Sequence, residues 1–239
     1  MYNERIIEKQ VELILRFSDV DAVFTNGNNI DENGNLVSKG SIPEKAKNRA
    51  LSFGELFGFV LEYGNFLFTP SALINTRIYQ DNYPFRYSQF GTSSDLDMWL
   101  RVSRSTCVYI VDECLIDYRI SKNQGSYNYN KGRTSLAIFF SVVDFHLKNV
   151  DTRVYREEVI DKYILHRKRD MMKCNVNRML AESNSEEYDV QVSLRDLKYG
   201  RDGDVLFLVF SSVVYKLFKN TVLSGWIAGL INRIDNVLN

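Results

Sequence analysis

Apolar residues recur at helical spacing near the start of the chain. Within residues 4–17 the apolar positions include Ile7, Val11, Ile14 and Leu15, with charged residues between them. A period near 3.6 residues predicts an amphipathic helix. We therefore expect these four side chains to form the face that packs against the rest of the fold.

Short apolar runs and helical patterns alternate through the next hundred residues. Runs of β-branched and aromatic residues predict strands, and the Asn-Gly pair at 33–34 predicts a tight turn between two of them. The strands are expected at 22–26, 36–40, 65–70 and, as two strands joined at Asp112 and Glu113, within 107–120. Helices are expected at 53–63 before Gly64, at 71–80 behind a cap at Thr69 or Ser71, and at 95–103.

The pattern changes from Arg133 onward. Strand-like alternation disappears, and helical periods follow at 133–149, 153–182 and 203–237. We therefore expect two regions. Residues 1–130 form an α/β region with a short mixed sheet and flanking helices, and residues 131–239 form a helical C-terminal region.

The composition is that of a folded protein without a charge bias. Of 239 residues, 45% are hydrophobic, and 30 basic residues balance 30 acidic ones, which argues against a nucleic-acid binder that works by phosphate neutralisation. The cysteines show no C-x-x-C spacing, and only two histidines could join them as soft metal ligands. A structural zinc site and a disulfide framework are therefore not expected. The residues concerned are Cys107, Cys114, Cys174, His146 and His166.

Segments near both ends of the chain bear on its location. The first ten residues, MYNERIIEKQ, lack the apolar core of a signal peptide, so we expect a cytoplasmic protein. The apolar runs 205–215 and 221–231 are shorter than the roughly 20 residues that a membrane-spanning helix needs. Two alternatives remain for them: burial against the domain, or peripheral contact of 205–231 with the cytoplasmic face of a membrane, with Lys216, Lys219 and Arg233 toward the headgroups.

The most informative motifs lie between residues 64 and 126. Residues 91–101 have the sequence GTSSDLDMWLR, and residues 112–126 have the sequence DECLIDYRISKNQGS. The upstream segments are GNFLFTPSALINTRIY at 64–79 and AVFTNGNNIDENGNLV at 22–37. In their order and gaps, these segments resemble the second half of a family 2 glycosyltransferase of the GT-A fold. The resemblance covers residues 1 to about 130.

The resemblance implies both a fold and a reaction. The fold is the acceptor-side part of a GT-A-like mixed sheet. The reaction is inverting transfer of a sugar from a nucleotide diphosphate sugar to a hydroxyl of a glycan or glycolipid, as in polysaccharide biosynthesis. Family members carry the nucleotide-binding half and a metal-binding D-x-D upstream of the matched segment. The complete enzyme is therefore expected to use Mg²⁺ or Mn²⁺, and this chain to self-associate or to bind a partner that carries the donor half.

The sequence itself offers no good metal-binding pair. Asp19 and Asp21 precede their predicted strand, whereas ligands gather at the carboxyl ends of strands, and Asp202–Asp204 opens a predicted helix. The chain also has Ile120 and Ser121 where the family commonly has a histidine. These departures keep a rival from another class open, namely a non-catalytic interaction or membrane-docking protein derived from the acceptor-side fold.

The candidate catalytic residue is Asp95. The resemblance places it at the position of the general base that deprotonates the acceptor hydroxyl. A capping role is the alternative, because Ser94 and Asp97 approximate a capping box and a carboxylate in the first helical turn is favoured by the macrodipole. Asp97 and Arg101 are candidate substrate-binding residues, and a plain i,i+4 ion pair is the alternative for them.

The remaining candidate substrate contacts are Trp99, Tyr118 and Arg119. Trp99 either packs in the core or stacks on a sugar. Other aromatic residues that could supply the stacking surface are Tyr83, Phe85, Tyr87 and Phe90. Tyr118 and Arg119 are expected on opposite faces of their strand, and Arg119 either contacts the acceptor or diphosphate or is an exposed charge.

Overall fold

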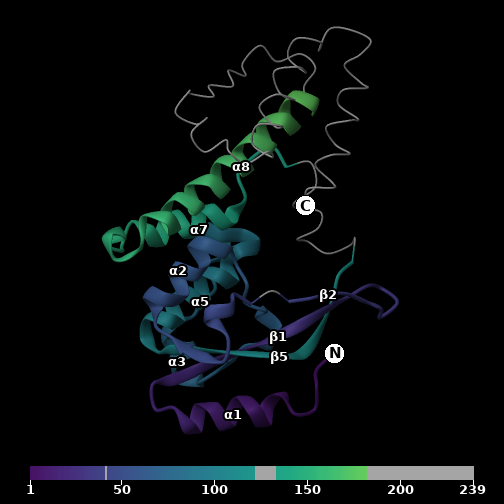
Figure 1. Cartoon of the computed structure of the whole chain (residues 1–239), viewed down its shortest axis with the longest axis vertical. Helices are drawn as coiled ribbons and strands as arrows, with labels where there is room; N and C mark the ends of the chain where they lie inside the picture. Colours follow the sequence, from purple (N-terminus) through teal and green to yellow (C-terminus); the bar gives the residue numbers. More distant parts are fainter. Residues whose placement is uncertain (41, 122–132, 182–239) are drawn as a thin grey trace. The chain divides into compact units, whose positions relative to one another are not determined.

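The computed structural model describes residues 1–40, 42–121 and 133–181 (Figure 1). The chain divides into two compact units. The first comprises residues 1–129 and 138–163, and the second comprises residues 130–137 and 164–239. The first unit holds a mixed sheet with flanking helices, so the expected α/β class is confirmed for it. Residues 138–163 are grouped with this unit, although the sequence pattern assigned them to the C-terminal region.

Two long parallel strands form the centre of the sheet. They are β1 (Val20–Ile30) and β5 (Cys107–Arg119), and they pair along nearly their whole length. Among the described residues the sheet has five strands in the order β2-β1-β5-β3, with β4 also paired to β1. The antiparallel strands are β2 (Leu36–Lys39), β3 (Arg49–Leu51) and β4 (Leu73–Ile74).

The predicted break within residues 107–120 is wrong. β5 is one strand of 13 residues. Thr25 pairs with Val111 but Asn26 pairs with Cys114, so Asp112 and Glu113 are extra residues in the register. The charged pair that suggested a turn is therefore accommodated as a bulge, which bends a strand without ending it.

Helices cover both faces of the sheet. In Figure 1, α1 (Ile6–Arg16) lies on one face, and α2 (Phe53–Tyr63) and α5 (Ser94–Ser105) lie on the other. Side chains of successive strand residues point to opposite faces. Accordingly, Val23 belongs to the cluster that packs under α1, while the Phe24 ring contacts the ring of Trp99 on α5.

The first helix is confirmed, but the face that it buries is only partly the predicted one. Of the predicted side chains, Ile14 packs against the core, whereas Ile7 is 56% exposed and Leu15 is 81% exposed, and Ile6 and Gln10 are buried instead. The Gln10 side-chain amide donates hydrogen bonds to the backbone carbonyls of Val23 (3.2 Å) and Ser71 (2.6 Å). A hydropathy pattern treats glutamine as a surface residue, so it does not show that Gln10 is buried. The predicted buried face of the helix is therefore displaced around the helix axis from the observed one.

The predicted strand at 65–70 is also wrong. Residues 69–71 form a short 3-10 turn, and the strand β4 follows it at Leu73–Ile74. The Ser71 hydroxyl accepts the backbone N–H of Thr25 and donates to its C=O. A side chain thus satisfies backbone groups that a paired strand would otherwise satisfy. The next helix, α3 (Thr76–Asn82), is capped by Asn75 and not by Thr69 or Ser71.

The other helices agree with the pattern where they are described. α2 begins with a capping box between Ser52 and Glu55 and ends at Gly64, whose φ of 80° suits glycine. The remaining helices are α4 (Tyr87–Phe90), α7 (Ile138–Leu147) and α8 (Glu157–Ala181). The last two confirm helical structure within 133–149 and 153–182, while the predicted helix at 203–237 lies outside the described residues.

The second unit is described only for residues 133–137 and 164–181. Within it, Arg133 forms an ion pair with Asp170 at 2.5 Å, and the Asp170 carboxylate also accepts the backbone N–H of Ala137 at 2.8 Å. These contacts tie residues 133–137, which precede α7, to α8. None of the helices in the described parts of the chain combines the length and the apolar character that a membrane crossing requires.

Candidate functional site

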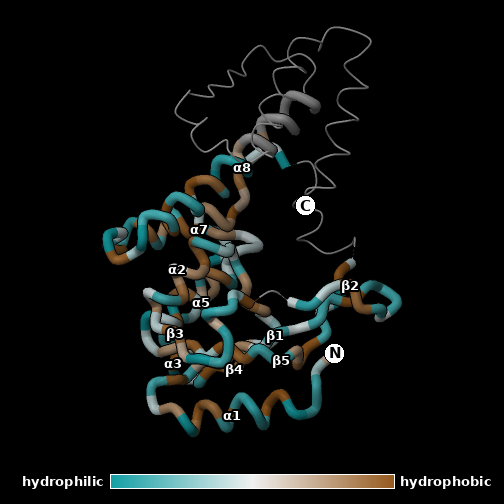
Figure 2. The backbone as a smooth tube through the Cα atoms, in the orientation of Figure 1, coloured by the Kyte–Doolittle hydropathy of each residue, from teal (hydrophilic) through white to brown (hydrophobic). Residues whose placement is uncertain are grey.

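An open pocket of about 780 Å³ lies in the first unit. Its wall combines the end of α2, the segment that follows α2, and the loop that leaves β2, with single side chains from α5 and β5. Asn29 of β1 and Ser38 and Lys39 of β2 also line it, and Figure 2 shows the hairpin of β1 and β2 as mostly hydrophilic. The lining residues are Asn29, Ser38, Lys39, Gly40, Ile42, Pro43, Glu44, Tyr63, Asn65, Phe66, Leu67, Phe68, Thr69, Pro70, Asp95 and Tyr118.

Asp95 is the carboxylate that α5 presents to the pocket. Its Oδ2 accepts a hydrogen bond from the Thr69 hydroxyl at 2.7 Å, and its Oδ1 accepts the backbone N–H of Leu96 at 2.7 Å. The Thr69 oxygen in turn accepts the indole N–H of Trp99 at 3.1 Å. A chain of two hydrogen bonds therefore joins the Trp99 indole, through Thr69, to Asp95.

The predicted capping box at the start of α5 does not form. The N-cap residue is Ser93, and its side chain makes no capping hydrogen bond. Asp97 points instead into a buried cluster, while Asp95 lies half-buried at the pocket. Asp95 therefore occupies the first helical turn, where the macrodipole favours a carboxylate, without serving as the cap.

Aromatic side chains line part of the pocket. Phe66 and Phe68 come from the segment after α2, and Tyr118 comes from β5. The rings of Phe68 and Tyr118 meet edge to face with centroids 6.3 Å apart. The Nη1 of Arg119 donates to the carbonyl oxygens of Asp31 (2.9 Å) and Glu32 (2.5 Å). Tyr118 thus belongs to the pocket, and Arg119 fastens the β1–β2 turn.

Trp99 is a core residue. It is 4% exposed and does not line the pocket. Its ring packs edge to face on Phe24 at 5.3 Å and on Phe85 at 5.7 Å. Of the other aromatic candidates, Tyr83 and Tyr87 are exposed but lie outside the pocket lining. The tryptophan therefore acts on the site indirectly, by holding Thr69.

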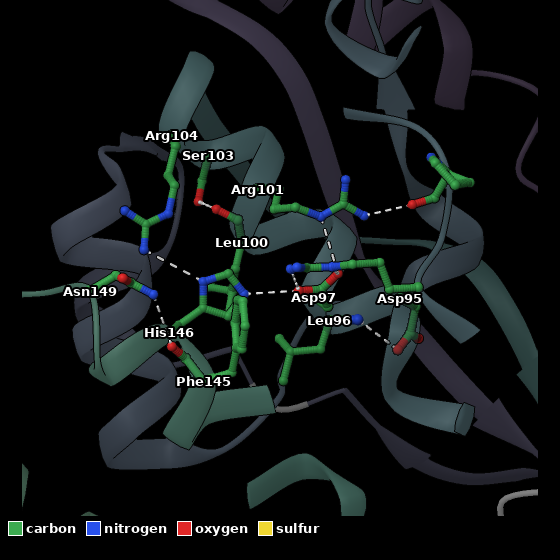
Figure 3. Close-up of polar contacts among 12 residues, drawn as sticks. Asp95, Leu96, Asp97, Leu100, Arg101, Ser103, Arg104, Phe145, His146 and Asn149 are labelled. Carbon is green, nitrogen blue, oxygen red and sulfur yellow. Dashed lines mark hydrogen bonds and ion pairs between the residues drawn. The ribbon is translucent and has the colours of Figure 1, made fainter. Parts of the chain in front are cut away.

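Asp97 and Arg101 lie in a separate buried cluster, drawn in Figure 3. The Asp97 carboxylate, which is 0% exposed, accepts hydrogen bonds from Arg86 Nε at 2.8 Å, Arg101 Nε at 3.1 Å and the His146 ring at 3.0 Å. Arg86 adds a second, parallel bond through Nη2. The i,i+4 ion pair between Asp97 and Arg101 is therefore confirmed, and neither residue lines the pocket.

Burial raises the pKa of the Asp97 carboxyl. Hydrogen bonds from His146 and Arg86, together with the charges of Arg86 and Arg101, outweigh this effect and hold that pKa well below its usual range. The carboxylate therefore stays ionised. A buried charge of this kind is tolerated because it is paired and its oxygens are hydrogen-bonded.

Sequence reasoning missed two features of this region. His146 belongs to the apolar helix segment IFFSVVDFHL, and no motif connects it with Asp97, 49 residues earlier. Gly40 lines the pocket, and a Cβ there would lie 2.2 Å from both Asn26 Oδ1 and a Phe68 ring carbon. A glycine that follows a β-prone run signals a turn, but it does not indicate such close packing.

The described residues do not fit a metal site. Within residues 1–40, 42–121 and 133–181, no group of three or more His, Cys, Asp or Glu side chains could hold an ion. The carboxylate of Asp21 accepts the side-chain amide of Asn75 at 2.8 Å, so this member of the Asp19–Asp21 pair already has a protein partner. The pocket lining contributes only two carboxylates, those of Glu44 and Asp95.

No protein-family model and no curated protein matches the chain.

Proposed function

We propose that this protein is a glycosyltransferase-like protein, and that its pocket receives the acceptor of the sugar. The donor would be a nucleotide diphosphate sugar, and the acceptor a hydroxyl of a glycan or glycolipid in the cytoplasm or at the cytoplasmic face of a membrane. The observation that carries the proposal is the position of Asp95. Its carboxylate lies at the wall of a pocket of about 780 Å³ and is fixed there by Thr69.

Asp95 would act as the general base of the transfer. It takes the proton of the acceptor hydroxyl, whose oxygen bonds to the anomeric carbon as the bond from that carbon to the diphosphate breaks on the opposite face. The configuration at this carbon inverts, and the diphosphate leaves with the bonding electron pair. A general base needs reach and orientation, and the hydrogen bonds from Thr69 and from the Leu96 backbone supply the orientation.

The other pocket residues suit a sugar or a sugar-linked acceptor. The rings of Phe66, Phe68 and Tyr118 offer apolar faces, and Asn29 and Asn65 add side-chain amides that can both donate and accept hydrogen bonds. Ligand sites generally combine apolar walls with a few convergent polar groups. The parallel pair β1–β5, with α5 behind it, further supports the acceptor-side part of a GT-A-like sheet.

A divalent metal belongs to this proposal through the family resemblance alone. Mg²⁺ or Mn²⁺ would neutralise the leaving diphosphate. Since the described residues offer no fitting ligand set, we derive no step through the metal.

Binding of saccharides to the full chain tests the pocket. We would use saturation-transfer NMR with a panel of neutral and acidic oligosaccharides, comparing the wild type with Tyr118→Ala. The control is Tyr87→Ala, because Tyr87 is 67% exposed and lies outside the pocket. We expect a saturation-transfer signal from at least one saccharide with the wild type. Tyr118→Ala should abolish this signal, and Tyr87→Ala should preserve it. If both variants still bind the saccharide, the pocket is not the saccharide-binding site.

The base is tested in a transfer assay on the chain in complex with the partner that is expected to carry the donor half, with UDP-, GDP- and TDP-sugars, Mn²⁺ and the saccharide that binds. Asp95→Asn should leave the thermal midpoint unchanged and slow release of the nucleoside diphosphate by about 10²-fold or more. Reduced stability with normal turnover would instead assign Asp95 a purely structural role.

A second candidate function is a non-catalytic interaction protein derived from the same fold. It is supported by the exposed side chains Ile7, Val11 and Leu15, which follow one another along α1. Exposed apolar surface of this kind often marks a contact with a partner. Saccharide binding to the pocket favours the first candidate. Its absence, together with self-association through α1, favours the second.

A further inference from the structure

His146 on α7 lies between two charged side chains of α5. The side chain is only 3% exposed. Its Nε2 is 3.0 Å from Oδ1 of Asp97, and its Nδ1 is 3.5 Å from Nη2 of Arg104 (Figure 3). The Arg104 guanidinium also packs over the ring of Phe53, with its central carbon 3.8 Å from the ring centre. Both ring nitrogens of the histidine therefore face a defined partner.

The chemistry of these partners fixes the proton on the ring. A guanidinium has only N–H donors, so Nδ1 of His146 has to accept from Arg104 with its lone pair. An ionised carboxylate has only acceptors, so Nε2 has to carry the hydrogen that is donated to Asp97. A doubly protonated ring would direct an N–H at the N–H of Arg104. The contacts are thus satisfied together by the neutral Nε2–H tautomer alone.

The Asp97 carboxylate joins α5 to α7 and to the residue before α4. Asp97 is held by His146 of α7, by Arg101 of α5 and by Arg86, which directly precedes α4. Phe145, next to His146 in α7, adds a ring contact to Phe90 of α4 at 5.5 Å. The buried anchor fixes the first turns of α5 in position and rotation.

The same turns carry the candidate base. Asp95 is two residues before Asp97, and the Trp99 indole that supports Thr69 lies two residues after it. A small rotation of this part of α5 would change the Trp99–Thr69–Asp95 chain of hydrogen bonds. The alignment of the pocket carboxylate therefore depends on what holds Asp97.

We propose that His146 is a positioning residue, which as the neutral Nε2–H tautomer holds Asp97 and thereby fixes the amino end of α5 that presents Asp95 to the pocket. Its bearing on catalysis rests on the proposed function of Asp95. The positioning itself does not, and it is tested below without any sugar, so that failure of one proposal is distinguishable from failure of the other.

The first test determines the tautomer in the full chain. The chain has only two histidines, so ¹⁵N-histidine labelling gives two imidazole patterns, and a His166→Gln variant identifies that of His146. We expect long-range ¹H–¹⁵N spectra at pH 7 to show His146 with a protonated Nε2 and an unprotonated Nδ1. The opposite tautomer, or a ring protonated on both nitrogens, would overturn the proposal.

The second test follows the Trp99 indole N–H. The chain has two tryptophans, and a Trp226→Phe variant assigns the two indole signals. His146→Leu places an apolar side chain at this position and removes both polar contacts. We expect it to shift or broaden the Trp99 signal and to speed amide exchange at Leu96 by about tenfold or more. His146→Gln offers a donor and an acceptor and should restore most of both properties.

A matched control separates positioning from general loss of stability. Val143 lies on the same helix and is 0% exposed, but its side chain has no polar group to lose. Val143→Ala should lower the thermal midpoint while leaving the Trp99 indole signal and the local exchange at Leu96 close to those of the wild type. If Val143→Ala changes them as much as His146→Leu does, or if His146→Leu changes neither, His146 has no positioning role.

Discussion

Replacing Asp97 by Asn removes a buried charge at the point where α7 and the residue before α4 meet α5. The wild-type carboxylate accepts two bonds from Arg86 and one each from Arg101 and His146. In Asp97→Asn, one of the two oxygens becomes an NH₂ group that faces donors. The two guanidiniums also lose the charge that compensates them.

The size of the expected loss in unfolding free energy depends on how deeply Asp97 and its two arginine partners are buried. Breaking a buried ion pair by removing one member costs about 3–5 kcal/mol, because an uncompensated charge is left behind. Here Asp97 is fully buried, but the side chains of Arg86 and Arg101 are 30% and 19% exposed, so water partly solvates them. We therefore expect a loss near the lower end, about 3 kcal/mol in the free energy of unfolding.

The assay is urea unfolding followed by tryptophan fluorescence in a Trp226→Phe background, so that the signal comes from Trp99 in the first unit. Asp151→Asn is the control, because the Asp151–Arg153 ion pair is largely exposed and its loss should leave the midpoint unchanged. A loss below about 1 kcal/mol for Asp97→Asn would refute the reasoning, since it would be close to the roughly 0.5 kcal/mol range that is usual for surface substitutions.

Three further predictions follow. Because the pKa of Asp97 is lower in the folded than in the unfolded state, its stabilising effect is complete above about pH 5 and is lost progressively as the pH falls toward the lowered folded-state pKa, so the difference in unfolding free energy between the wild type and Asp97→Asn should shrink steadily below about pH 5. Gly40→Ala should lower the unfolding free energy by about 1–3 kcal/mol in thermal melts, because the new Cβ meets Asn26 and Phe68, whereas Gly54→Ala in α2, with open space around its Cβ, should be neutral or stabilising. Light scattering after size exclusion should give the wild type a mass above that of one chain and Leu15→Glu a smaller one, and a monomeric wild type would contradict self-association through α1.

The sequence pattern predicts well the elements whose apolar side chains follow one period. Residues 53–63 form the predicted helix, and Ser52 and Gly64 begin and end it because both act within the local backbone. The helix around Trp99 is found for the same reason. Such elements need only local information, namely a hydrophobic period and the residues at their two ends.

The hydropathy pattern fails where a buried polar side chain holds an element in place through hydrogen bonds. Gln10 is 1% exposed and anchors α1 through two backbone carbonyls, so the helix rotates away from its most apolar face. Ser71 takes the place of a strand residue beside Thr25. Both side chains form hydrogen bonds with backbone groups from distant parts of the chain. A local hydropathy average does not include such long-range hydrogen bonds.

The candidate site shows the same division between local and distant information. Asp95 is identified by its local motif, and the structure places it at the pocket. Asp97 belongs to the same motif but points inward, since helix geometry turns a residue two positions later by about 200°. One motif therefore supplies a pocket carboxylate and a buried anchor. Which is which depends on Arg86 and His146, whose distance in sequence from the motif hides their contribution until the chain is folded.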